Sequence, residues 1–425
     1  MATLPWGGLP YPAAGPGSQG VSGGAGMGPA RKRVFLLITD AGGGHRGTAE
    51  SLLAAVKAAG LPWDLRIVNA YKEILKDAEF GQRFFRISGE DVYNFTLKND
   101  MTAWVPAMRE ASFYLIRRQF QRASAAARSF FRRERPDLVV SLMPLVNDVF
   151  VSALEGGAPL GLLMTDLVDT RPAMWLTPAI CRRAAFVGVG CPEAAGQARE
   201  AGVAGALLEC GLVIHPGYFD PAVRSLSRRE ARRRLGLEPG TPTLLLMMGG
   251  YGSSALKRFA RRLESLPRRV QLVASCGRNE ALREGMKALA PRLRNRLVPL
   301  GFCSPLNLVM RAADLVVTKP GPASLLEAMA MGLPAVLDDF HTMPQEIPNV
   351  ADVERRGLGW VLKDRADLPR LVGRLLDDPG DLEAMRGRYS ALGLKDASGP
   401  VLAAMAGALG ARQERSREAR DPAPA

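Results

Sequence analysis

Three glycine-rich segments of this 425-residue chain carry residue types that bind phosphate groups. They are Thr39–Arg46 (TDAGGGHR), Met248–Ser254 (MGGYGSS) and Lys319–Ser324 (KPGPAS), and each follows or ends an apolar run. Glycine lets a backbone approach a ligand closely, and the N-terminus of a helix that begins there favours negative charge. The first segment is neither G-x-G-x-x-G nor a P-loop. The pattern predicts loops that hold a phosphate-bearing ligand.

Glu327 lies one helical turn beyond the third segment, on the same face of a helix expected at Leu325–Met331. A carboxylate in this place could accept hydrogen bonds from both hydroxyls of a ribose. A lone glutamate is usually a solvated surface residue, but its spacing from the loop favours a nucleoside ligand.

Short apolar runs alternate with helical patterns and must position these loops. The first set of expected strands is 34–39, 64–69, 138–142, 160–165 and 185–189, and the second is 243–248, 270–275, 298–300, 315–318 and 335–337. Two successive sets of parallel strands with crossover helices predict two doubly wound α/β domains. Ligands of such sheets bind beyond the carboxyl ends of the strands, which is where the glycine segments lie.

The domain boundaries follow from composition. We expect a disordered Gly/Pro-rich leader at 1–30, an N-terminal domain at 31–214 and a C-terminal domain at 215–392. A helix at 393–410 is expected to pack back, with a disordered tail at 411–425.

Composition limits the classes of function. The formal net charge of +14 predicts an anionic partner, which could be nucleic acid, a membrane surface or a phosphorylated substrate. The five cysteines contain no C-x-x-C pair, which argues against a zinc site and favours a reducing cytoplasm. No apolar run approaches the ~20 residues that span a bilayer, and the N-terminus does not have the pattern of a signal peptide.

Six segments occur in an order that resembles a known family. They are 42–46 (GGGHR), 165–167 (TDL), 249–250 (GG), 276–279 (CGRN), 319–327 (KPGPASLLE) and 345–350 (QEIPNV). Together they resemble the monogalactosyldiacylglycerol synthases of plants and the bacterial processive diacylglycerol glucosyltransferases, in glycosyltransferase family 28. The likeness runs from Arg33 to Asp377 and is strongest in the second half.

The resemblance implies the GT-B fold, in which two Rossmann-like domains face each other across a cleft, and a UDP-sugar donor. Arg278 and Phe302 would flank uracil, and Glu327 would bind ribose. Gln345 and Glu346 would bind the sugar hydroxyls, with Asn349 supporting them. The diphosphate would be held by Gly250, Tyr251, Gly252, Ser253 and Ser254 together with Ala323 and Ser324. Further candidates for binding the donor are Gly43, Gly44, Gly321 and Pro322.

The implied reaction is inverting transfer of a hexose to a lipid hydroxyl, without a cofactor or an essential metal. Direct displacement needs a base that accepts the proton of the acceptor. His45 is the first candidate, and a contact to a headgroup or diphosphate is an equal alternative role for it. Asp166 is the second candidate base or the residue that orients the base. His215 is expected to be structural, and His341 could line the cleft.

Several positions depart from the family pattern. The family's usual His-Pro pairs are replaced by Met143-Pro144 and Arg171-Pro172, both in the acceptor-side domain. The usual Gly-Pro-Gly-Thr is Gly321–Ser324 here, and Pro348 changes the sugar-side segment. These departures leave the donor hexose and the acceptor lipid open.

A basic and aromatic stretch at Phe113–Arg135 is expected to be one amphipathic helix, either packed on its own domain or lying on an anionic membrane. The resulting interpretation is a cytoplasmic enzyme, peripheral on the inner face of the cell membrane, that acts on diacylglycerol or a related lipid. Alternatives are transfer of N-acetylglucosamine to another lipid, a UDP-N-acetylglucosamine 2-epimerase-like enzyme, and a nucleic-acid binder. The chain shows no base-stacking or helix-turn-helix pattern for the last class.

Overall fold

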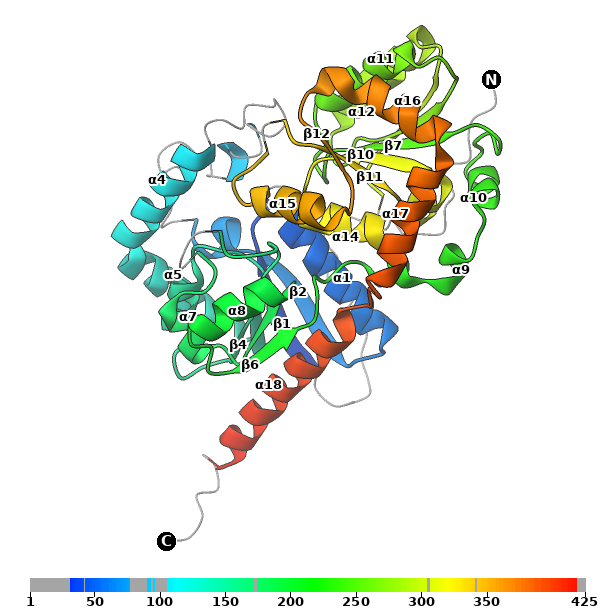
Figure 1. Cartoon of the computed structure of the whole chain (residues 1–425). Coiled ribbons are helices and arrows are strands. Elements are labelled where there is room, and N and C mark those ends of the chain that lie inside the picture. The colour runs from blue at the N-terminus through cyan, green and yellow to red at the C-terminus, as the bar shows by residue number, and fades with distance from the viewer. Residues whose placement is uncertain are drawn as a thin grey trace, which may run out of the picture.

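The structure, a computed structural model, describes residues 31–41, 43–76, 90–92, 95, 105–170, 174–303, 306–340 and 342–418. It contains two α/β domains, each built on a six-stranded parallel sheet (Figure 1). The expectation of two doubly wound domains is confirmed. The leader predicted at 1–30 lies outside the described residues.

The N-terminal sheet has the strand order β2-β1-β3-β4-β5-β6. Its strands are β1 (Lys32–Ile38), β2 (Trp63–Asn69), β3 (Leu138–Ser141), β4 (Leu160–Leu163), β5 (Phe186–Val189) and β6 (Ala206–Glu209). The central strands are continuous apolar runs because helices cover both faces of a parallel sheet. Its helices are α1 (Gly44–Ala58), the π-helix η1 (Ala70–Ile74), α4 (Val105–Arg118), α5 (Phe120–Glu134), α6 (Asn147–Ala153), α7 (Pro178–Arg183) and α8 (Pro192–Glu200).

The C-terminal sheet has the order β12-β11-β10-β7-β8-β9. Its strands are β7 (Thr243–Met247), β8 (Gln271–Ser275), β9 (Arg296–Leu300), β10 (Leu315–Thr318), β11 (Ala335–Asp338) and β12 (Trp360–Leu362). The helical elements of this half are η3 (Pro216–Phe219), α9 (Pro221–Arg224), α10 (Arg228–Arg234), α11 (Ala255–Arg262), η4 (Leu263–Ser265), α12 (Glu280–Leu289), η5 (Ala290–Arg292), α13 (Asn307–Ala312), α14 (Pro322–Ala330), α15 (Ile347–Arg356), η6 (Arg365–Asp367), α16 (Leu368–Asp377) and α17 (Pro379–Ala391).

Strand register brings the predicted loops together. Leu37 of β1 pairs with Ser141 of β3, which pairs with Leu162 of β4, so the loops after these three strands lie side by side. In the other domain, Met247 of β7 pairs with both Ser275 of β8 and Thr318 of β10. The glycine segments therefore lie at the carboxyl edges of the two sheets.

The last helix, α18 (Ser398–Glu418), returns to the N-terminal domain and lies along it in red in Figure 1. Val401, Met405 and Leu409 join the hydrophobic cluster that contains Val34, Leu36 and other residues of β1 and α1. The expected end at residue 410 is wrong, because good helix formers continue the helix to Glu418 and the Arg412 guanidinium donates to Pro136 O at 2.6 Å.

The expected single helix at 113–135 is also wrong. It is divided into α4 and α5 at Gln119, whose φ of −103° and ψ of 10° are not helical. Phe130 and Phe131 of α5 are buried in the core, whereas Tyr114 and Leu115 of α4 are exposed. In the described part of the chain, no helix is long and apolar enough to cross a bilayer.

Candidate active site

A cavity of about 400 Å³ is lined by loops of both domains. Apolar side chains line part of its N-terminal half, among them Leu115, Met143 and Met174. The residues expected at the site that line this cavity are Gly43, Gly44, His45, Asp166, Gly250, Arg278, Phe302, Gly321, Pro322, Ala323, Ser324, Glu327, Gln345 and Glu346. Residues that are far apart in the sequence therefore share one cavity between the domains.

His45 is held at the start of α1 as a neutral imidazole. Its Nδ1 donates to the carbonyl oxygen of Leu142 at 2.6 Å, and Thr165 Oγ1 lies 3.0 Å from the same nitrogen. A carbonyl can only accept, so Nδ1 carries the proton and Nε2 keeps a lone pair. Burial lowers the pKa of His45 to about 4. The ring can accept a proton at neutral pH, as a general base must.

Gly43 explains where α1 begins. It caps α1 with a φ of +86°, which glycine adopts at little cost. A Cβ on Gly43 would lie 3.4 Å from the ring of Tyr251 in the other domain. The glycine thus both turns the chain into α1 and lets the two domains approach.

Asp166 follows β4 and is bound by a buried tryptophan. Trp175 Nε1 donates to Asp166 Oδ2 at 2.9 Å, and the Trp175 ring lies 6.1 Å from that of His45. The pKa of Asp166 is raised to about 7, mainly by burial; the Trp175 hydrogen bond opposes this rise and the nearby Glu346 adds to it. This carboxyl group can exchange a proton near neutral pH.

Trp175 is in turn fixed by Asp169, which our sequence analysis missed. Asp169 Oδ2 accepts hydrogen bonds from the backbone N–H groups of Trp175 at 3.0 Å and Leu176 at 3.1 Å. Neither residue lies in a glycine segment. The only available signal was their position shortly after the Thr165-Asp166-Leu167 segment.

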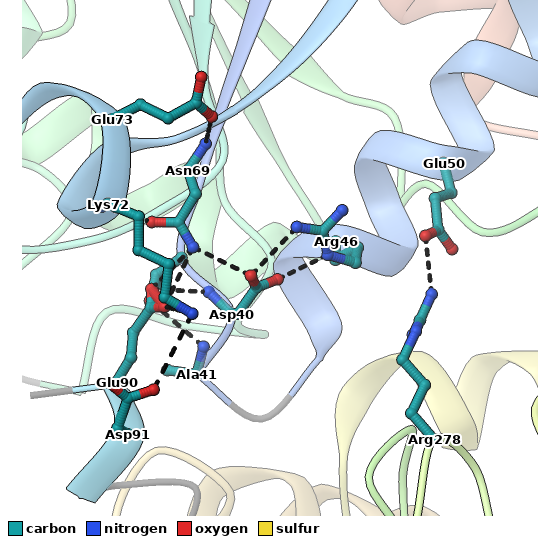
Figure 2. A network of polar contacts seen from close by, with 11 residues as sticks. Asp40, Ala41, Arg46, Glu50, Asn69, Lys72, Glu73, Glu90, Asp91 and Arg278 are labelled. Carbon is teal, nitrogen blue, oxygen red and sulfur yellow. Dashed lines mark hydrogen bonds and ion pairs between the residues drawn. The ribbon is translucent and has the colours of Figure 1, made fainter. Parts of the chain in front are cut away.

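A polar network supports the first glycine segment (Figure 2). Arg46 Nε and Asn69 Nδ2 donate to Asp40 at 2.6 Å and 3.0 Å. The buried carboxylate of Glu90 accepts from Thr39 Oγ1 and Asp40 N, at 2.9 Å and 3.0 Å. Glu90 was not predicted from the sequence, because it lies far from any recognisable pattern.

The Arg278 guanidinium lies 3.5 Å from the centre of the Phe302 ring. Its Nη2 also donates to Glu50 Oε1 of α1 at 2.8 Å, so this residue ties the two domains together (Figure 2). Next to it, Gly277 has a φ of +58°, and a Cβ there would lie 2.1 Å from Gly250 O. Glycine is therefore required where the two loops meet.

Glu327 is paired with Tyr218 of η3, a buried residue that the sequence analysis also missed. Burial raises the pKa of Glu327 to about 8, and a hydrogen bond with Tyr218 lowers it. The Tyr218 hydroxyl oxygen also accepts from Leu306 N at 3.2 Å. The segment that joins the domains thereby positions the candidate ribose-binding carboxylate.

If the site binds the UDP-sugar that the resemblance implies, Tyr218→Phe should raise KM for this donor about three- to tenfold at neutral pH, with kcat nearly unchanged. Loss of the hydroxyl raises the pKa of Glu327 further, so less of the carboxylate is ionised. The pH above which KM falls should therefore shift upward from about 8. Steady-state kinetics across pH 6–10 test this. Tyr389→Phe, which removes a buried hydroxyl bound to Leu358 O, is the matched control. An unchanged KM profile in Tyr218→Phe would contradict the role.

Lys319 and Glu346 form an ion pair at the sugar side of the cavity. Glu346 is 5% exposed, and Lys319 also lines the cavity. Asn349 does not line the cavity. It lies buried on α15 and donates from Nδ2 to Pro320 O at 2.7 Å, which supports the third glycine segment.

Three more expected site residues are not among those that line the cavity. Tyr251 contacts Gly43, as described above. A Cβ on Gly252 would meet Cys276 O at 2.5 Å, so this glycine serves loop packing. Ser253 is buried, and its Oγ accepts from Ala255 N at 3.2 Å at the start of α11. These three residues shape the loop that places Gly249 and Gly250 at the cavity.

Ala323 and Ser324 lie in the first turn of α14, which begins at Pro322 rather than at the expected Leu325. Proline is favoured at the first position of a helix, and the N–H groups of the first turn have no partner within the helix. Both residues line the cavity. The third glycine segment thus places the N-terminus of α14 at the cavity.

The structure describes some of the remaining candidates and not others. His215 does not line the cavity, and its Nδ1 accepts from Gly217 N at 3.0 Å, which is a structural role. Met143 and Pro144 do line it. His341, Gly42 and Arg171-Pro172 lie outside the described residues.

Comparison with solved structures defines the fold. The chain aligns with the MurG of Acinetobacter baumannii with a TM-score of 0.55 and 13% identity, over 90% of this chain and 99% of that one. It aligns with CalG4, the calicheamicin glycosyltransferase, with a TM-score of 0.56 and 16% identity, over 91% and 99%. The fold is GT-B, as expected.

Sequence comparison defines the family. Residues 243–389 match the glycosyltransferase family 28 C-terminal domain. The chain is 30% identical to a probable monogalactosyldiacylglycerol synthase 2 of Oryza sativa, over 81% of this chain and 74% of that one. It is 28% identical to monogalactosyldiacylglycerol synthase 1 of Arabidopsis thaliana, over 80% and 64%.

The protein is therefore a glycosyltransferase with the GT-B fold. Within that class, the chain belongs to the monogalactosyldiacylglycerol synthase family of glycosyltransferase family 28.

Proposed function

We propose that the protein transfers a hexose from a UDP-sugar to the hydroxyl of a lipid, with diacylglycerol as the acceptor and inversion at the sugar carbon. Family membership supports sugar transfer to a lipid. The observation that carries the proposal is the shared cavity, in which a neutral His45 and Asp166 face the glycine loops and the start of α14.

In the proposed reaction, the acceptor hydroxyl attacks the sugar carbon as the bond to the diphosphate breaks. His45 Nε2 accepts the hydroxyl proton, with Asp166 as the alternative acceptor. The loops at Gly249 and Gly250, the first turn of α14 and the Lys319 ammonium group stabilise the negative charge that develops on the leaving diphosphate. Arg278, Phe302 and Glu327 bind the nucleoside, and Gln345 and Glu346 bind the sugar. This scheme uses no metal or cofactor.

We propose that the part of the cavity that binds the acceptor opens to the outside next to α4. Ser112, Leu115 and Ile116 of this helix line the cavity, while Tyr114 is 63% exposed on its outer surface. Arg117 and Arg118 lie in the last turn of the same helix. Apolar side chains next to cations suit an anionic membrane surface. We propose that the enzyme works there as a peripheral protein on the cytoplasmic side.

The test is incubation of the purified protein with vesicles that contain diacylglycerol and, in turn, UDP-glucose, UDP-galactose and UDP-N-acetylglucosamine. Mass spectrometry of the extracted lipids should show one monohexosyl product that depends on both donor and diacylglycerol. If no donor gives a glycolipid, the proposal is wrong. A product formed from another lipid in a total extract, but not from diacylglycerol, would correct the acceptor.

A further inference from the structure

A second cavity, of about 500 Å³, lies at the edge of the N-terminal sheet where strands β3 and β4 begin. It is lined by residues that precede β3 and β4, whereas the candidate active site is lined by residues that follow these strands. Its walls come from the end of α5, the loop between α6 and β4, and α18. It is thus separate from the cleft between the domains.

Four arginines line this cavity: Arg128, Arg132 and Arg135 from α5 and its C-cap, and Arg412 from α18. Arg128 Nη2 donates to Ser152 O at 3.2 Å, and Arg412 Nη1 donates to Pro136 O at 2.6 Å. Backbone carbonyls thereby hold two of the guanidinium groups in place without neutralising them.

Little negative charge opposes these cations. Glu155 is the carboxylate among the described lining residues, and it is paired with Arg183 at 2.9 Å. Arg412 has a long ion pair with Asp137, at 3.5 Å. Arg132 and Arg135 are exposed, and within the described ranges their guanidinium groups have no hydrogen bond or ion pair. The cavity therefore has a local excess of positive charge.

The dipole of α5 does not account for this arrangement. Basic residues are favoured in the last turn of a helix, which explains Arg132. Arg128 lies a turn earlier, and Arg412 comes from another helix. Arg135 takes a left-handed backbone conformation with φ of +47°, where glycine is usual. An arginine at this strained position points to a use for its side chain.

We propose that this cavity binds a phosphate group, carried either by a small soluble phosphate ester or by a lipid headgroup. Guanidinium groups bind phosphate oxygens through paired, charge-assisted hydrogen bonds, and several of them around one anion suit a dianion. A phosphate there would contact α5 and α18 together. It would hold the end of α18, the helix that follows the C-terminal domain in the chain, against the N-terminal domain.

The test compares two double variants in the full-length protein. Arg132→Gln/Arg135→Gly removes the two unpaired cations, and glycine suits the left-handed backbone at 135. Arg122→Gln/Arg229→Gln removes the same charge from exposed positions on α5 and α10 that do not line the cavity. Each protein is titrated calorimetrically with inorganic phosphate and tested for flotation with phosphatidylcholine vesicles, with and without phosphatidic acid.

We expect the first variant to lose at least about tenfold in affinity for phosphate or for phosphatidic acid vesicles, while the control variant stays near wild type. Phosphate bound elsewhere is common to all three proteins, so the difference isolates this cavity. Loss in the phosphate titration supports a soluble ligand, and loss in flotation alone supports a headgroup. Equal binding by all three proteins, or equal loss in both variants, would overturn the proposal.

Discussion

Replacing His45 with alanine is expected to lower kcat by about 100- to 10,000-fold, the range typical for loss of a general base. The imidazole is neutral, its Nδ1 is occupied by Leu142 O, and its Nε2 can take the acceptor's proton. The measurement is kcat with saturating donor and acceptor. His215→Asn, which replaces a histidine outside the cavity and keeps a hydrogen-bond acceptor, serves as the control. A His45→Ala enzyme with near wild-type kcat would refute the assignment.

The pH dependence of kcat separates the two candidate bases. If His45 accepts the proton, activity should persist to about pH 5 and fall on acidification with a midpoint near 4, where the imidazole becomes charged. We expect this profile. A midpoint near 7 would instead assign the step to Asp166, whose carboxyl must then be ionised. Saturating donor is essential, because ionisation of Glu327 acts on KM near pH 8.

Replacing Asp166 is expected to change the stability of the protein as well as its activity. The pKa of this carboxyl is raised from 3.8 to about 7 by burial, so the folded state holds a proton that the unfolded state has released. Stability is therefore lost as pH rises from about 4 to 7, and the loss stays constant above pH 7. Asparagine has no charge to bury and can still accept from Trp175 Nε1.

We therefore expect Asp166→Asn to raise the Tm at pH 8 by about 5 °C or more, and to leave it nearly unchanged at pH 4. If the Asp166 carboxylate acts in the reaction, the kcat of this variant should fall. The variant would then be more stable and less active than the wild-type protein. Thermal melts of both proteins across this pH range make the comparison. Equal Tm values at pH 8 would show that Asp166 is not held in an unfavourable environment.

The parts that could be predicted from the sequence are those in which one local pattern determines the outcome. A buried strand followed by glycines and a helix places His45 and Ala323 at the carboxyl edges of the two parallel sheets, and the buried strand β4 places Asp166 at the edge of the first sheet. The short strands β6 and β12 were missed. Both are edge strands with three consecutive apolar residues; β6 buries none of its residues and β12 buries only Leu362, so neither has the longer buried run of the central strands.

The residues that support the site could not be predicted in the same way. Tyr218, Trp175 and Glu90 act through hydrogen bonds to residues that are 9 to 109 positions away. Their types and neighbours in the sequence do not reveal these partners, which depend on how the helices and loops are packed. Likewise, Gly252 and Ser253 stand within the second glycine segment, and only the packing of Cys276 against it shows that they serve the loop.

The position of α18 has a consequence for how the protein folds during synthesis. The N-terminal domain fills one face of its sheet with Val401, Met405 and Leu409, which are translated after the whole C-terminal domain. Domains normally fold as units, in the order in which they leave the ribosome. Here the first domain leaves first but keeps an apolar face of β1 and α1 uncovered until the last helix emerges. Its completion therefore comes after the C-terminal domain has been made, and truncation near residue 397 should damage the N-terminal domain rather than the C-terminal domain.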